Sequence, residues 1–238
     1  MAIGPERNYM TRAQAGVADI DVGLRQYMLK VYDYMAGGLV LTGLIAFAAV
    51  SIPAVREIVF PLRFVALFAT FGIALFMGFR IHAMRAATAQ ALFWVYAALM
   101  GVWISPILLI YTGASIAQTF FITAGTFAAM SLYGYTTKRD LSQFGSFLVM
   151  GLFGIILAIV VNLFLRSPAI DFAISILGVL IFTGLTAWDT QRIKEWYFEH
   201  DAAEVMTKKA IQGALQLYLD FLNLFLFLLR FVGVVRSN

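Results

Sequence analysis

The chain has 238 residues, of which 62% are hydrophobic, 13% are charged and none is cysteine, and its formal net charge is +4. Soluble domains carry about 25% charged and about 45–50% apolar residues, so this composition excludes a water-soluble globular protein. The lack of cysteine excludes disulfides, thiolate metal sites, iron–sulfur clusters and a cysteine nucleophile. The positive residues flank apolar stretches, so they indicate membrane orientation rather than nucleic-acid binding.

The first 30 residues are charged and contain no apolar core followed by a small-residue cleavage site. Residues 1–30 are therefore predicted to form a retained cytoplasmic tail rather than a signal peptide. Residues 31–236 are predicted to form a single transmembrane domain, because the connections between apolar stretches are short and no soluble linker interrupts them.

Seven apolar stretches follow the tail. Each is long enough to cross about 30 Å of hydrocarbon as a helix of about 20 residues. They are continuous rather than alternating, which favours helices over barrel strands. Pro106 is expected to kink the third of them. The sequence thus predicts an all-α integral membrane protein with seven transmembrane helices, at residues 31–52, 61–80, 90–111, 115–136, 144–165, 170–190 and 210–233.

The distribution of Lys and Arg predicts which way the chain faces. Twelve of these residues lie on the side of the N-terminal tail and five on the other side. Because cytoplasmic loops carry the excess of positive charge, the N-terminus is predicted inside and the C-terminus outside. Short loops and the absence of eukaryotic retention signals favour a bacterial inner membrane. Arg230, near the outer end of the last span, is expected to extend its charge to the interface.

Two aspartates lie inside the last two apolar stretches, where a charge near the bilayer centre costs at least about 2.5–3.5 kcal/mol. Asp189 is near the cytoplasmic end of the sixth span, and Asp220 is about ten residues into the seventh. An antiparallel hairpin with a turn near residues 204–205 would set them opposite each other. Other polar residues share their helix faces, namely Thr186 and Thr190 beside Asp189, and Gln216 and Asn223 beside Asp220.

These two carboxyl groups are expected to form one site. Two carboxylates a few ångströms apart in a low dielectric cannot both ionise at low cost, so the pair should share one proton and respond to pH. Without that proton, Asp189 and Asp220 would attract a cation, with Asn223 and Thr190 as further oxygen ligands. Calcium prefers about six to eight oxygens, so it would bind weakly and transiently, which suits permeation. In the alternative interpretation, Asp189 is an interfacial residue that pairs with Arg192.

Arg80 and Arg85 end the second span on the predicted cytoplasmic side. Either arginine could reach the acid pair and hold a gate shut. The alternative for each is that it extends to the interface under the positive-inside rule.

Three segments carry a family resemblance: Trp188–Gln191 and Leu217–Phe225 in the last hairpin, and Lys138–Ser142 before the fifth span. With them the chain resembles the Bax inhibitor-1 family, also called the transmembrane Bax inhibitor motif family, and the likeness covers nearly the whole chain. The resemblance implies a seven-helix fold in which the last helix is central and the other six surround it. It also implies a pH-sensitive cation leak, with calcium as the usual ion, governed by an aspartate dyad that falls on Asp189 and Asp220. The family's basic latch would fall on Arg85, or alternatively on Arg80.

Other functions remain to be compared with the leak. For some bacterial relatives the resemblance implies a regulator that binds another membrane protein, such as a membrane-bound AAA protease. No enzyme activity and no cofactor are expected. An intramembrane aspartyl protease would need a Gly-x-Gly-Asp motif, which neither Asp189 nor Asp220 has. A retinal protein would need a lysine inside the last span, but Lys208 and Lys209 precede it. The expected partners are the lipid bilayer, calcium or other cations, and the protease of the alternative.

Overall fold

The computed structural model describes residues 12–236, with side chains from residue 22 onwards, and it is a helical bundle. A short 3-10 turn, η1 (Ile81–Ala83), links the second helix to the third. In chain order the α-helices are α1 (Arg12–Ser51), α2 (Pro53–Arg80), α3 (Ala86–Ile104), α4 (Ile107–Ile110), α5 (Gly113–Thr136), α6 (Ser142–Leu165), α7 (Pro168–Glu195) and α8 (Ala203–Val232).

Seven helical segments of the described chain are long and apolar enough to cross a membrane, which confirms the predicted spans. The short α4 belongs to the third of them, because α3 stops at Ile104 and the helix resumes after Pro106. Proline lacks a backbone N–H and its ring clashes with the preceding turn. The kink expected at Pro106 is therefore present as a break between α3 and α4.

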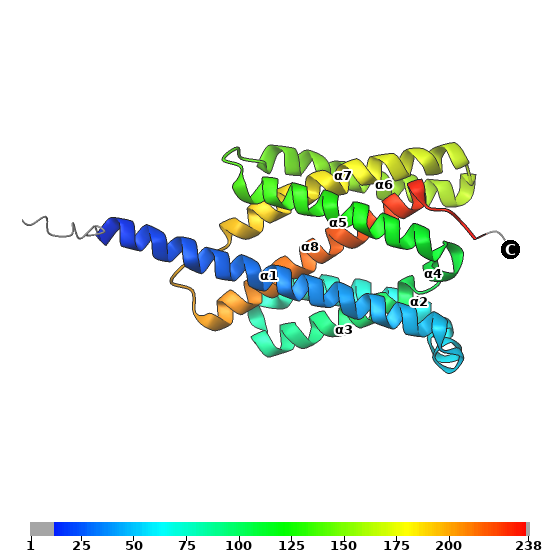
Figure 1. Cartoon of the computed structure of the whole chain (residues 1–238), viewed down its shortest axis with the longest axis horizontal. Helices are drawn as coiled ribbons and strands as arrows, with labels where there is room; N and C mark the ends of the chain where they lie inside the picture. The colour runs from blue at the N-terminus through cyan, green and yellow to red at the C-terminus, as the bar shows by residue number, and fades with distance from the viewer. Residues whose placement is uncertain (1–11, 237–238) are drawn as a thin grey trace, which may run out of the picture.

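Helix α1 begins well before the first predicted span. It is 40 residues long and starts at Arg12, so residues 12–30 of the predicted tail continue the helix. A charged helical extension outside the bilayer has no hydropathy signal, which is why the apolar pattern did not reveal it. Figure 1 shows α1 reaching past the other helices at its N-terminal end. Residues 1–11 of the predicted tail, with Arg7, lie outside the described residues.

The α7–α8 hairpin lies inside the bundle, and α2 and α6 lie at its periphery. Helix α8 packs against α7, α1, α5 and α3, whereas α6 packs mainly against α7, and α2 mainly against α3 and α1. Of the residues in each spanning window, 61% are buried in α8 but only 11% in α2 and in α6. The arrangement in which all six other helices surround the last one stays a prediction.

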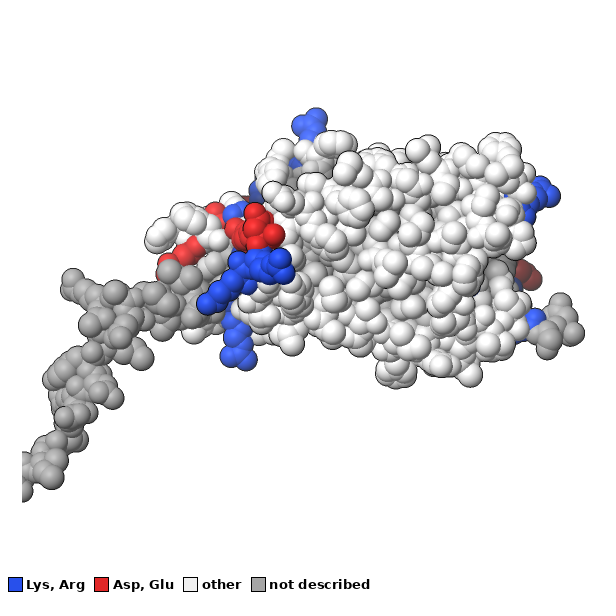
Figure 2. Space-filling model, turned by 90° about the horizontal axis from the view of Figure 1, so that it is seen from above, with Lys and Arg blue, Asp and Glu red and all other residues white. Residues whose placement is uncertain are grey.

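The outer surface of the bundle is a wide apolar belt between two charged ends. Figure 2 shows this belt as an almost continuous white surface, with most of the visible Lys, Arg, Asp and Glu gathered near the N-terminal end. Large side chains such as Phe79 and Phe164 are more than 80% exposed on the peripheral helices. Such a surface is stable only in lipid, so the chain is an integral membrane protein. Which end is cytoplasmic stays a prediction.

Candidate functional site: an acid pair inside the bundle

The two predicted aspartates meet. Asp189 of α7 and Asp220 of α8 line the same cavity, and their carboxyl groups are close enough to interact electrostatically. Their exposed fractions are only 9% and 4%. The connection between the helices spans residues 196–202, earlier than the predicted turn at residues 204–205. The aspartates still align because α8 extends past the end of α7: Lys209, two turns into α8, donates to the backbone oxygen of Trp196 over 2.8 Å.

A cavity of about 670 Å³ adjoins the acid pair. Its walls are mostly apolar and come from α2, α3, α6, α7 and α8. Asp189, Asp220, Gln216 and Asn223 all line it, so the predicted polar face of α8 does point into one space with both carboxyl groups. The cavity therefore places the acid pair beside a volume within the range of about 300–1,000 Å³ that is typical of small-ligand sites.

Two buried acceptor atoms on residues that line this cavity lack a protein partner. Asp220 Oδ2 and Gln216 Oε1 are buried and make no hydrogen bond in the described part of the chain. By contrast, Asn223 donates its amide to the backbone oxygen of Leu219 over 2.9 Å. A buried acceptor without a donor costs roughly 1–3 kcal/mol, so these two oxygens favour a ligand or water that can donate to them.

The two threonines predicted to support the acid pair turn to another side of α7. Thr186 donates to the backbone oxygen of Phe182, and Thr190 donates to that of Thr186. The hydroxyl of Thr190 is also 3.0 Å from that of Ser131 on α5. Neither threonine lines the cavity. Thr186 and Thr190 are one turn apart on a face of α7 that is rotated away from Asp189. The polar residues of α7 therefore do not all point to the same site.

Arg80 and Arg85, the predicted latch residues, are exposed and do not line the cavity. The arginine that does line it is Arg192, one turn after Asp189 on α7. Its guanidinium lies over the rings of Trp188 and Trp196, with 4.8 Å and 5.4 Å to their centroids. The i, i+3 spacing from Asp189 was the sequence signal for this position, and the alternative interpretation paired the two residues on that ground. Among the described side chains, neither ion pair involves Asp189 or Asp220.

Two long polar side chains near the end of α7 hold the hairpin against the end of α5 and the connection from α5 to α6. Gln191 accepts from the backbone N–H of Leu141 and donates to the oxygen of Arg139, both over 2.8 Å. Lys194 donates to the backbone oxygen of Tyr135 at the end of α5 over 2.8 Å. Because Gln191 and Lys194 flank Arg192 and follow Asp189 closely, these contacts fix the rotation of α7 at the acid pair.

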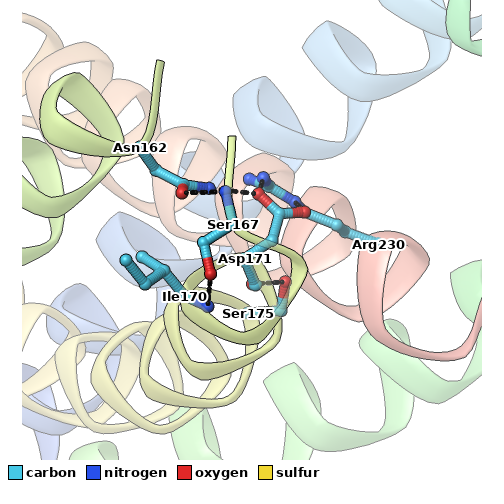
Figure 3. Close-up of polar contacts among 6 residues, drawn as sticks. All are labelled: Asn162, Ser167, Ile170, Asp171, Ser175 and Arg230. Atoms are coloured by element: carbon cyan, nitrogen blue, oxygen red, sulfur yellow. Dashed lines mark hydrogen bonds and ion pairs between the residues drawn. The ribbon is translucent and has the colours of Figure 1, made fainter. Parts of the chain in front are cut away.

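A second polar cluster joins α6, α7 and α8 at the opposite end of the bundle, as Figure 3 shows. Arg230 forms a two-pronged ion pair with Asp171, and its Nε donates to Asp171 Oδ2 over 2.8 Å. Asn162 donates to the other oxygen of Asp171 over 3.1 Å and accepts from the backbone N–H of Ser167 over 2.9 Å. Arg230 thus binds another helix instead of simply extending to the interface as expected. Asp171 lies in the first turn of α7, and the sequence pattern did not indicate that it would form an ion pair.

Comparisons with known proteins agree with the fold. The family model described as "Inhibitor of apoptosis-promoting Bax1" matches residues 24–237. Protein RP147 of Rickettsia prowazekii is 52% identical over 219 residues, 91% of this chain and 93% of that protein. A Caulobacter vibrioides protein is 46% identical over 245 residues, 97% and 98% of the two chains. The inner membrane protein YbhL of Escherichia coli is 46% identical over 216 residues, 89% and 92% of the two chains. The chain therefore belongs to the Bax inhibitor-1 family.

Proposed function

We propose that this protein is a pH-sensitive cation leak, with calcium as the expected ion, and that it has no enzymatic role. The observation that carries the proposal is the carboxyl pair Asp189 and Asp220, buried in the membrane-spanning part of the bundle beside a cavity of about 670 Å³. The Escherichia coli relative is named an inner membrane protein, so the same bacterial membrane is the proposed location.

The chemistry of the pair supports a switch. Close carboxyl groups in a low dielectric hold a shared proton, and its loss leaves a net negative charge that attracts a cation. The ligand set is small: the described residues contain no group of three or more His, Cys, Asp or Glu side chains placed to hold a metal. Because calcium prefers about six to eight oxygens, it would stay only briefly, as conduction requires.

Arg192 takes the place of the latch in this proposal. It lines the same cavity as Asp189 and Asp220, whereas Arg80 and Arg85 do not. A fixed positive charge beside the acid pair opposes the entry of a second cation. Protonation of the pair would leave Arg192 as the main charge of the cavity, so the balance between the two sets the occupancy of the site.

Calcium flux into proteoliposomes that hold the purified chain tests the proposal. The wild type is expected to conduct, with rates that differ between about pH 6 and about pH 8, while Asp189→Asn and Asp220→Asn remove the pH difference. Asp33→Asn is the matched control, because Asp33 is an exposed aspartate of α1. A flux that is absent, or that both dyad variants leave unchanged, contradicts the leak. Co-purification of a membrane-bound AAA protease without any flux would favour the regulator.

A further inference from the structure

The cavity at the acid pair opens toward the lipid rather than toward either aqueous end. Helices α2 and α6 both line it but do not pack closely against each other. Phe71 of α2 and Ile156 of α6 line it while being 65% and 48% exposed. Each lies near the middle of its helix, and hence near the middle of the bilayer. A molecule that enters here comes from the hydrocarbon.

Three residues of the cavity lining carry hydrogen-bond acceptors. Asp220 Oδ2 and Gln216 Oε1 are buried without a hydrogen-bond partner, and Asp189 adds a second carboxyl group. A ligand that satisfies these acceptors must donate several hydrogen bonds and carry positive charge. An alkylammonium group has three N–H donors and no acceptor. Its apolar chain suits the remainder of the lining, which includes Phe182 and Phe227.

Calcium meets these walls poorly, because most of the cavity surface offers no oxygen ligand. An anionic lipid would bring phosphate oxygens to carboxylates and unpaired acceptors, which repel them. Arg192, the other charged side chain of the lining, lies toward the C-terminal end of α7 from Asp189 and weakens the binding of any cation. Tyr96 completes the titratable groups of the lining.

We propose that the cavity between α2 and α6 binds a single-chain aliphatic amine in its ammonium form, with the nitrogen at Asp189, Asp220 and Gln216 and the chain directed to the lipid. The proposal uses the same acid pair as the proposed leak but stands whether or not the chain conducts ions. Bound there, the amine would occupy the position from which a metal cation is held.

The test is equilibrium dialysis of radiolabelled decylamine against the full chain in phosphatidylcholine nanodiscs, with empty nanodiscs as the background. Saturable binding is expected, weakened at least about tenfold in Asp220→Asn, because one partner of a buried charge pair is removed. Gln216→Leu should weaken it less, since one neutral acceptor is lost. Arg192→Gln should tighten it at least about twofold, because a repelling charge disappears. A gain of affinity cannot come from misfolding.

Two controls separate this site from partition into lipid and from the leak. Asp33→Asn should bind like the wild type, and neutral decanol should not compete. Decyltrimethylammonium, which has charge but no N–H donor, should compete more weakly than decylamine. Equal binding to the wild type and Asp220→Asn, or equal competition by decanol, overturns the proposal. Calcium flux without amine binding refutes only the amine site, and amine binding without flux refutes only the leak.

Discussion

The α7–α8 hairpin and the helices α2 and α6 cross the same membrane but differ in how much of their surface is buried. The hairpin is buried and carries Asp189, Asp220 and Gln216, whereas α2 and α6 expose large apolar side chains to lipid. In water the hydrophobic effect would drive α2 and α6 inward, but lipid tails are as apolar as leucine and exert no such force. Burial in this protein therefore reflects packing and polar chemistry, and it marks the residues whose replacement matters.

The closest backbone approach to the hairpin should give the largest effect. A Cβ at Gly134 of α5 would lie 2.1 Å from the backbone oxygen of Ala187. Since α7 cannot yield without losing its neighbours, Gly134→Ala is expected to lower the free energy of unfolding by about 2–3 kcal/mol. Gly125 lies on the same helix with nothing within 4 Å of its Cβ position. Gly125→Ala should instead add roughly 0.5–1 kcal/mol.

Reversible unfolding by titration with sodium dodecyl sulfate in mixed micelles measures both glycine variants. The comparison between buried and lipid-facing surfaces breaks if the two substitutions shift the unfolding midpoint equally or in the same direction.

Leucine truncation should separate the two regions with a smaller effect. Leu224 of α8 is 0% exposed and packs with Leu148, Phe182 and Leu185, whereas Leu157 of α6 is 66% exposed. Leu224→Ala should cost about 2 kcal/mol, near the low end for buried leucines, because only the cavity term remains in lipid. Leu157→Ala should change the free energy of unfolding by less than about 0.5 kcal/mol. The same titration decides, and a cost at Leu157 that matches the cost at Leu224 would contradict the assignment of this face of α6 to the lipid.

The smallest effect is expected at the cluster that ties α7 to α8 at their far ends. The Asp171 and Arg230 side chains are 39% and 37% exposed, so solvent screens their ion pair. Asp171→Asn should therefore cost at most about 0.5–1 kcal/mol, and the double variant with Arg230→Gln should cost little more. A double-mutant cycle measures the coupling. A coupling well above that range would show that the hairpin depends on both of its ends.

The sequence predicted the spans and the meeting of the aspartates because both follow from hydropathy and helix period. Gln216 and Asn223 line the same cavity as Asp220, because all three share a face of α8. The sequence could not separate Thr190 from Asp189, because adjacent residues differ by about 100° in direction and the position of α5 was unknown. Arg192 was visible beside Asp189, but only packing shows that it, rather than Arg85, lines the cavity. The roles of these residues stay predictions.

Helix α1 is longer than the membrane is thick. A helix of 40 residues is about 60 Å long at 1.5 Å per residue, while a whole bilayer with its headgroups is about 40–45 Å thick. At most roughly 15–20 Å of helix therefore stands clear of the membrane, when α1 is upright. Rotating the whole helix of about 60 Å by about 10° about its C-terminal end moves its N-terminal end by about 10 Å. A small tilt of α1 among the other spans would therefore appear as a larger displacement of its N-terminal end.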